Sequence, residues 1–208
     1  MLKLIALPFF AYLLGSIPWG LVLTRMFTSV DIRQHGSGNI GATNVKRVAG
    51  SIPGMLTLAG DVLKGAVPVW LAMTLTGPSS VWGQMYISFV ALAVFGGHLY
   101  PVFLKFKSGG KGVATATGCF FVISPVAGMI AMLVFIMFVC WWERVSAGSL
   151  AAAATLPVAV WEASHSGVVT GCAFVTAIFI YLRHKDNIKR LLSGTEPKIG
   201  DWFGCLTG

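Results

Sequence analysis

The sequence has few charged residues: Asp, Glu, Lys and Arg together make up 11% of its 208 residues. Soluble domains carry about 25%, so this chain has too little charge to cover a water-soluble globule, and a disordered chain is excluded as well. Hydrophobic residues make up 56%, and apolar stretches of membrane-spanning length recur from end to end. The composition predicts an all-α polytopic membrane protein in which residues 1–208 form one domain.

The motifs of several common chemistries are also missing. The four cysteines form no CxxC pair and lie at no metal-ligand spacing from histidine. Cys119, Cys140 and Cys172 lie in apolar runs and are expected to be inert core thiols, while Cys205 lies in the tail. No GxSxG elbow, HExxH motif or HxxxxD motif occurs. We therefore expect no metal, no cofactor and no covalent nucleophile.

Seven apolar segments are expected to form about seven transmembrane helices. Ser124-Pro125 separates two of them because proline cannot continue the helical hydrogen bonds behind it, and Glu143-Arg144 is a charged interruption. Only the first three approach the roughly 20 residues that cross a bilayer unaided, so five longer spans are an alternative with the same parity. The segments are Leu4–Thr24, Ile52–Leu75, Val81–Phe103, Val113–Ile123, Val126–Trp142, Ala147–Trp161 and Val168–Leu182.

The basic residues predict the orientation of these spans. There are 15 Lys and Arg against 7 Asp and Glu, and all the basic residues except Lys3 and Lys64 fall in alternate loops or in the tail. Such loops face the cytoplasm under the positive-inside rule. The prediction is a multi-pass membrane protein with its N-terminus outside and its C-terminus in the cytoplasm. The positive charge then serves topology or anionic substrates, and no nucleic acid is expected as a partner.

The first basic loop, residues 25–51, combines glycines with amides, hydroxyls and arginine. Glycines allow backbone N–H groups to approach an anion closely, and an arginine can hold a phosphate with two hydrogen bonds. A flexible polar turn is the plainer alternative. The sequence favours a phosphate cradle, whose candidate binding residues are Ser37, Asn39, Asn44 and Arg47.

The second basic loop runs directly into the apolar segment that starts at Val113. Glycines before a helix N-terminus make an anion site because unpaired N–H groups and the helix dipole both point outward there. Lys111 adds a full charge, although the spacing is not that of a P-loop. A loop that serves topology alone is the alternative. The candidate residues are Gly109, Gly110, Lys111 and Gly112.

The tail and two membrane segments hold further polar residues. If the last span continues as a helix, His184 and Asn187 share a face, although a basic helix lying on anionic lipid is equally consistent with the sequence. Asp61 and Lys64 are three residues apart inside the bilayer, so they should pair with each other or bind a ligand. Whether they are structural or functional stays open, and His98 is more simply read as structural.

The order of these motifs resembles that of the bacterial acyl-phosphate:glycerol-3-phosphate acyltransferases over nearly the whole chain. One departure from the family pattern is Ser108, which is inserted after Lys107. The motifs are Gly15-Ser16-Ile17-Pro18, the run from Gly36 to Asn44 with Arg47, Asp61-Val62-Leu63-Lys64-Gly65, Gly97-His98, the run from Gly109 to Thr115, and Arg183-His184 with Asn187 and Glu196.

This resemblance implies an activity and roles for the residues. The family's enzymes are bacterial inner-membrane proteins that make lysophosphatidic acid at the cytoplasmic face without acyl-CoA or acyl carrier protein. No cofactor and no obligatory protein partner are expected. By resemblance, Ser37 and Arg47 bind glycerol 3-phosphate and the loop with Lys111 is associated with the acyl-phosphate. His184 and Asn187 form the third motif, which also contains a more structural Glu196.

The groups themselves are compatible with such chemistry. An acyl-phosphate is already activated, so the 1-hydroxyl of glycerol 3-phosphate can attack its carbonyl directly while Lys111 stabilises the departing phosphate. His184 is either the general base or a phosphate ligand. We expect the loops to converge on one membrane face, with the acyl chain left in membrane lipid. Acyl-chain preference and oligomeric state are not evident from the sequence.

Three other functions are consistent with parts of the sequence. Another lipid-phosphate transferase would use a different acyl or head-group donor. A phosphate-ester transporter or channel would need polar residues through the full bilayer depth, whereas only Asp61 and Lys64 lie deep. A purely structural membrane protein would leave the concentration of glycine, amide and arginine unexplained.

Overall fold

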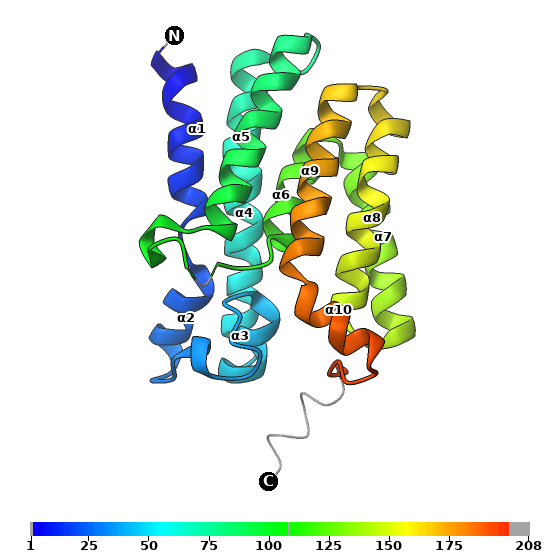
Figure 1. Cartoon of the computed structure of the whole chain (residues 1–208). Coiled ribbons are helices and arrows are strands. Elements are labelled where there is room, and N and C mark those ends of the chain that lie inside the picture. The colour runs from blue at the N-terminus through cyan, green and yellow to red at the C-terminus, as the bar shows by residue number, and fades with distance from the viewer. Residues whose placement is uncertain (1, 108, 200–208) are drawn as a thin grey trace. The chain divides into compact units, whose positions relative to one another are not determined.

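The computed structural model describes residues 2–107 and 109–199, so Ser108 and Cys205 lie outside the described residues (Figure 1). All regular structure within those two ranges is helical. The helices are α1 (Leu2–Gly15), α2 (Trp19–Phe27), α3 (Ala42–Ala49), α4 (Ser51–Thr76), α5 (Val81–Leu99), α6 (Val113–Ile123), α7 (Pro125–Trp142), α8 (Val145–Ser164), α9 (Gly167–Arg183) and α10 (Lys185–Leu192), with 3-10 turns at Ile32–Gln34 and Val102–Leu104.

The prediction of an all-α multi-pass protein is confirmed. Within the described residues, four helices, α4, α5, α7 and α8, are long and apolar enough to cross a membrane. Two bent pairs, α1 with α2 and α9 with α10, raise the number to six if each pair is one span. Helix α6 has 11 residues, about 16 Å at 1.5 Å per residue, which is too short to cross a hydrocarbon core of about 30 Å alone. All seven predicted apolar segments are therefore helical, and the structure supports four to six helices or bent helix pairs that are long enough to cross the membrane.

The segment Leu4–Thr24, expected as one continuous span, is instead broken. Helix α1 ends at Gly15, α2 begins at Trp19, and the two meet at a bend of 40°. Pro18 has no N–H to continue the helix. The side chain of Lys64 donates to the Ile17 carbonyl over 3.0 Å. The same carbonyl accepts the Trp19 N–H over 3.1 Å. A lysine on another helix thus adds a second hydrogen bond to a carbonyl group at the break, where the regular helical ladder stops.

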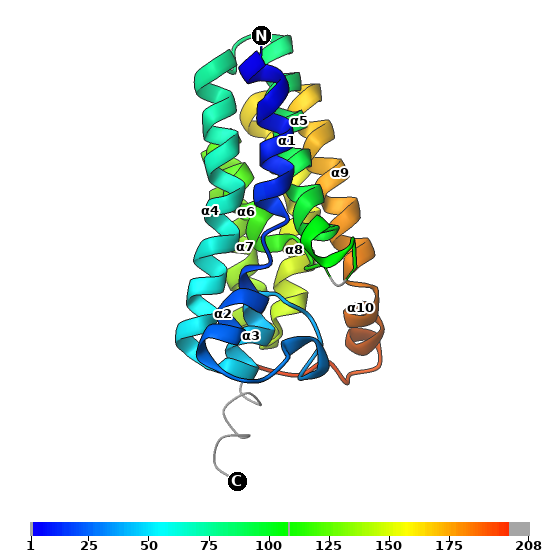
Figure 2. The ribbon, with the colours of Figure 1, turned by 90° about the vertical axis from the view of Figure 1, so that its left-hand side faces the viewer.

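The chain divides into two compact units, Met1–Ile123 and Ser124–Gly208. In the first unit α4 is the central helix and contacts α1, α2, α3, α5 and α6, while α1 also packs along α5 (Figure 2). Small residues permit these close approaches: a Cβ on Gly97 of α5 would overlap the Tyr12 carbonyl of α1, and one on Gly118 of α6 would overlap the Val62 carbonyl of α4. The polar loops lie at the ends of helices packed in this way.

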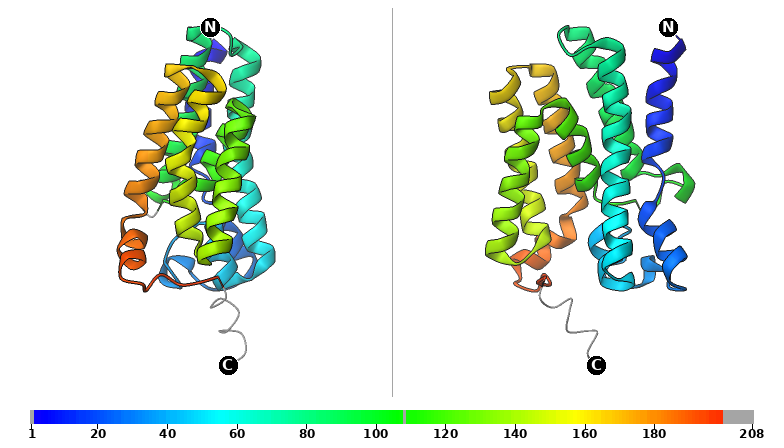
Figure 3. Two further views of the ribbon diagram at one scale, coloured as in Figure 1. Left: turned by 90° about the vertical axis from the view of Figure 1, so that its right-hand side faces the viewer. Right: turned by 180° about the vertical axis from the view of Figure 1, so that it is seen from behind.

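In the second unit α8 lies between α7 and α9 and contacts both, and the shorter α10 packs on α8 and α9 (Figure 3). The chain bends by 62° between α9 and α10. The breaks predicted at Ser124-Pro125 and Glu143-Arg144 are the N-terminus of α7 and the α7–α8 connection. The expectation that Cys140 is a core thiol is wrong, because it lies on an exposed side of α7, whereas Cys119 and Cys172 are buried.

Candidate active site

The first polar loop contains a glycine turn that is held in place by one buried amide. Gly36 and Gly38 have φ values of 60° and 68°, so both adopt the left-handed conformation that glycine permits. The side chain of Asn44 is 2% exposed. Its Oδ1 accepts from the Ser37 N–H over 2.9 Å, and its Nδ2 donates to the carbonyls of His35 and Asn39 over 3.0 and 2.9 Å. Asn44 therefore shapes the loop.

The other predicted residues of this loop surround the same turn. Asn39 accepts the Gly41 N–H over 2.9 Å just before α3 begins, and Ser37 is exposed. Arg47 lies one turn after Asn44 on α3 and is partly exposed. Its stem lies beside the turn, since a Cβ on Gly36 would be 3.4 Å from its Cδ. The structure thus brings Ser37, Asn39, Asn44 and Arg47 together.

An apolar cluster fixes this loop to the helices beneath it. Leu21 of α2, Ile32 and Ile40 of the loop and Val45 of α3 are all buried together. Leu104, which precedes the second polar loop, packs against the same cluster. The two basic loops therefore share an anchor within the first unit.

An acidic side chain at the start of the loop is paired locally. Arg33 Nη2 lies 2.6 Å from Asp31 Oδ2. The hydrogen bond from the Arg33 side chain lowers the pKa of Asp31 to about 2, and the Arg33 N–H adds a second bond. Asp31 is thus ionised at neutral pH and compensated by Arg33.

The second polar loop lies against the end of α5. Gly109 and Gly110 are buried, and the Gly110 N–H donates to the His98 carbonyl over 3.2 Å. Gly112 has a φ of 84° and lies against the Phe95 ring, and α6 begins at the next residue, as predicted. Lys111 is partly exposed between these buried glycines. Its charge is therefore held directly before a helix N-terminus, the arrangement that favours an anion.

The two intramembrane charges pair with each other. Asp61 and Lys64 are each 3% exposed, and Lys64 Nζ lies 2.7 Å from Asp61 Oδ1, which confirms that they face the interior. His98, 5% exposed, places Nδ1 3.6 Å from the same oxygen. Sequence reasoning missed this third member. Because His98 lies on another helix, only the joint position of α4 and α5 reveals it.

In the second unit, His184 lies at the α9–α10 junction and is 2% exposed. Its Nδ1 is 2.8 Å from the Ile180 carbonyl. Since a carbonyl only accepts, Nδ1 must carry the hydrogen, and in the neutral ring the basic lone pair is then on Nε2. The backbone of α9 thus fixes both the ring orientation and the tautomer.

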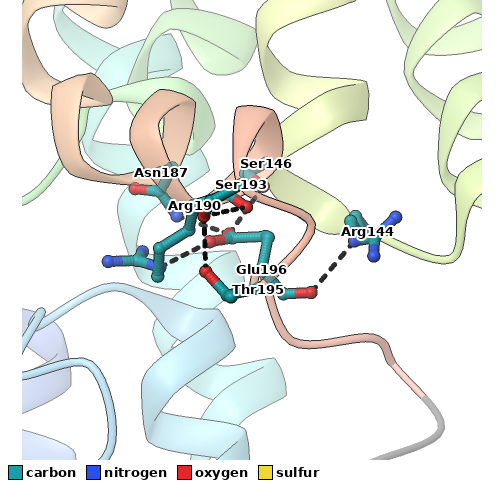
Figure 4. A network of polar contacts seen from close by, with 7 residues as sticks. All are labelled: Arg144, Ser146, Asn187, Arg190, Ser193, Thr195 and Glu196. Atoms are coloured by element: carbon teal, nitrogen blue, oxygen red, sulfur yellow. Dashed lines mark hydrogen bonds and ion pairs between the residues drawn. The ribbon is translucent and has the colours of Figure 1, made fainter.

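Asn187 lies one turn later and is held by Glu196 (Figure 4). Its Nδ2 donates to Glu196 Oε1 over 2.6 Å, and Ser146 and Arg190 donate to the same carboxylate over 2.6 and 2.7 Å. Arg144 Nε donates to the Glu196 backbone carbonyl over 2.9 Å. Burial opposes ionisation of Glu196, but the three side-chain hydrogen bonds lower its pKa below the usual value. The tail after α10 is thereby fastened to the start of α8.

Comparison with known proteins decides the family. The model of the glycerol-3-phosphate acyltransferase family matches residues 5–194. The chain belongs to this family. It is 51% identical to a glycerol-3-phosphate acyltransferase of Syntrophotalea carbinolica, over 90% of this chain and 93% of the relative, and 46% identical to that of Geobacter sulfurreducens, over 95% and 98%.

Two solved acyltransferase structures share the fold. Both are crystal structures of PlsY, an integral membrane glycerol 3-phosphate acyltransferase. The glycerol 3-phosphate form has a TM-score of 0.91 at 39% identity and covers 99% of this chain and 100% of its own. The lysophosphatidic acid form has a TM-score of 0.86 at 40% identity and covers 94% and 95%. The predicted family and the membrane acyltransferase activity are therefore confirmed.

Proposed function

We propose that this acyltransferase moves a fatty acyl group from an acyl-phosphate to the 1-hydroxyl of glycerol 3-phosphate, giving lysophosphatidic acid and inorganic phosphate. The acceptor and the product are supported by the two PlsY structures, one in its glycerol 3-phosphate form and one in its lysophosphatidic acid form. The donor is supported above all by Lys111, placed between buried glycines at the N-terminus of α6. That site suits an anionic leaving group.

The proposed reaction is a direct displacement. The 1-hydroxyl oxygen forms a bond to the acyl carbon, the bond from that carbon to the phosphate oxygen breaks, and the electron pair leaves with phosphate. The hydroxyl proton passes either to His184 or to an oxygen of the acyl-phosphate. Because the donor is already activated, no covalent enzyme intermediate is needed.

We assign the acceptor site to the first loop. Arg47 would pair with the phosphate of glycerol 3-phosphate, with Ser37 and Asn39 as neutral hydrogen-bonding groups, and Asn44 would keep the turn in shape. This division follows from their surroundings. Both Oδ1 and Nδ2 of Asn44 form hydrogen bonds to the backbone of the loop, while Ser37 is exposed. Positioning of a bound reactant contributes several kcal/mol to such a reaction.

We assign the departing phosphate to Lys111 and to the backbone of Gly109, Gly110 and Gly112, in which the Gly110 N–H donates to the His98 carbonyl and holds the loop in place. A preorganised positive site of this kind stabilises charge as it develops. His184 would act as base or phosphate ligand through Nε2, and Asn187 would orient glycerol 3-phosphate. We propose that residues 1–208 act as one functional domain.

We also propose that the basic loops face the cytoplasm of a bacterial cell with the protein in the inner membrane. The support is the charge distribution, since 13 of the 15 Lys and Arg fall in segments expected on one side. The acyl chain would remain in the surrounding lipid.

The test is an assay of purified protein with glycerol 3-phosphate and one of three donors: palmitoyl phosphate, palmitoyl-CoA or palmitoyl-acyl carrier protein. We expect lysophosphatidate and inorganic phosphate in equal amounts with palmitoyl phosphate alone. Product from palmitoyl-CoA or the carrier protein, without use of palmitoyl phosphate, would contradict the proposed donor while leaving the family assignment intact.

A further inference from the structure

Three acidic or basic side chains are buried among the apolar helices of the first unit, where removing a charge from water costs free energy. Asp61, Lys64 and His98 are all at most 5% exposed. Charges at this depth are costly and are usually retained for a function. The Asp61–Lys64 pair alone would satisfy both charges within α4. Each partner, however, also reaches a second segment of the chain.

Lys64 and Asp61 connect α4 to different neighbours. Lys64 donates to the Ile17 carbonyl at the α1–α2 break, over 3.0 Å. Asp61 Oδ1 lies 3.6 Å from His98 Nδ1 on α5. The carboxylate that faces the imidazole at the end of α5 is itself held by the ammonium, and it lies at ion-pair distance from the ring, beyond a hydrogen bond.

His98 in turn determines where the second polar loop lies. The His98 carbonyl accepts the Gly110 N–H over 3.2 Å. On the other side of the residue, the ring nitrogen Nε2 occupies the space that a Cβ on Gly110 would need. Gly109 lies equally close to the Leu99 carbonyl. The loop is thus seated on the last turn of α5, and the residue after Gly110 is Lys111.

We propose that Asp61, Lys64 and His98 are positioning residues for the acyl donor: they fix the imidazole against Gly110 and thereby place Lys111 for the departing phosphate. The proposal rests on the role given to Lys111 under the proposed function. It predicts that the buried cluster affects reaction with the acyl donor more than binding of glycerol 3-phosphate, because the residues proposed to bind glycerol 3-phosphate lie in the first loop.

The first experiment measures steady-state kinetics of purified His98→Asn and Asp61→Asn against palmitoyl phosphate and glycerol 3-phosphate, with the thermal midpoint of each variant. Asparagine at 98 keeps a polar group at the Nδ1 position but loses the atoms that contact Gly110. We expect kcat/KM for palmitoyl phosphate to fall at least tenfold in both variants while KM for glycerol 3-phosphate changes less than twofold.

The matched control is Thr57→Val. Thr57 is fully buried on the same helix, and its hydroxyl donates only to the Pro53 carbonyl of its own helix, over 2.8 Å. It should leave both kinetic constants within twofold. Unchanged donor kinetics in His98→Asn, or equal losses for both substrates that follow the thermal midpoint, would overturn the proposal and leave the cluster purely structural.

A double-mutant cycle keeps the test decisive if Asp61→Asn fails to fold. Gly110→Ala should reduce turnover at least a hundredfold in the wild-type background, because the new methyl group overlaps His98 Nε2. In the His98→Asn background the same change should cost less than tenfold. Equal costs in both backgrounds would overturn the proposal.

The proposed donor and the positioning role fail in different ways. If the wild-type protein used palmitoyl-CoA and ignored palmitoyl phosphate, the donor assignment would fail. The same variants would then be measured with palmitoyl-CoA, and a selective loss for that donor together with a non-additive cycle would still support the positioning role.

Discussion

Two arginines in the first polar loop differ in what surrounds them. Arg33 is paired with Asp31 at 2.6 Å, whereas Arg47 lies on α3 beside the glycine turn. We expect Arg47→Ala to raise KM for glycerol 3-phosphate by about tenfold to a hundredfold, the equivalent of one charged hydrogen bond. The measurement is steady-state kinetics together with the thermal midpoint in detergent.

Arg33→Ala is the matched control because it removes the same charge from the same loop. It should change KM for glycerol 3-phosphate less than threefold. If Arg47→Ala lowered stability and turnover in parallel, Arg47 would be a structural residue and the acceptor site would have to lie elsewhere.

The orientation of His184 separates two roles for its ring. Nδ1 bonds to the Ile180 carbonyl, and asparagine can reproduce that donor while glutamine reaches farther, toward the Nε2 position. A general base requires a titratable Nε2, so both His184→Asn and His184→Gln should lose more than a hundredfold in kcat. Near-normal turnover of His184→Gln would assign the residue to phosphate binding instead.

At the scale of single residues, the sequence predicted where the polar residues lie better than it predicted which groups they contact. Asn44 was expected to bind substrate, and it lies at the start of α3 beside the loop, where its amide is engaged by four backbone groups. The Lys64 contact with Ile17 joins residues 47 positions apart. Only the tertiary packing of α4 against the α1–α2 break determines that contact.

At the scale of elements, two neighbouring glycines of α5 give a clean comparison. A Cβ on Gly97 would overlap the Tyr12 carbonyl of α1, while a Cβ on Gly96 would meet no atom within 4 Å. We expect Gly97→Ala to lower the unfolding free energy by about 1–3 kcal/mol through separation of α1 from α5. Gly96→Ala should be neutral or stabilising by up to about 1 kcal/mol. Thermal unfolding in detergent distinguishes them, and equal effects would refute this packing.

The tail after α10 depends on Glu196. Glu196→Ala leaves Asn187 and Ser146 without an acceptor that each now uses, so we expect a loss of about 1–3 kcal/mol. Lys198→Ala is the control, since the Lys198–Glu143 pair is about half exposed and such pairs contribute about 0–1 kcal/mol. Comparable losses in the two variants would contradict the network as the main fastening of the tail.

The same carboxylate predicts a pH dependence. Its hydrogen bonds lower the folded-state pKa of Glu196 below the usual value of 4.5. Its stabilisation is therefore complete above pH 4.5 and is lost as the pH falls through the lower, folded-state pKa. Wild type should lose thermal stability more steeply than Glu196→Gln on acidification below pH 4.5. Parallel pH profiles would show that Glu196 is not the group responsible.

Local signals located most helices but not their bends. The glycines before Val113 and the Ser124-Pro125 pair predicted both ends of α6 correctly, because glycine and proline affect the backbone conformation of adjacent residues. The α1–α2 break was missed, because hydropathy alone continues through Gly15–Pro18. The short helix α3, Ala42–Ala49, was likewise expected to be loop, because its polar composition resembles that of a loop and gave no sign of a helix.

At the scale of the whole molecule, the orientation in the membrane is open to a direct test. In a variant lacking the native cysteines, we expect Ser79→Cys to react with a membrane-impermeant maleimide in intact cells, and Lys107→Cys to react only after permeabilisation. The reason is the concentration of Lys and Arg in the loops expected inside. The reverse pattern would place the basic loops outside and contradict the proposed cytoplasmic site.

The bond from Lys64 to the Ile17 carbonyl also bears on biosynthesis. When the ribosome has made only α1 and α2, the lysine that will cap their break has not yet been translated. In a nascent chain arrested before residue 64, that carbonyl would therefore have the Trp19 N–H as a donor but would lack the ammonium group. Completion of the amino-terminal bend must wait for α4 to enter the bilayer, which couples the shape of the earliest segment to the arrival of a later one.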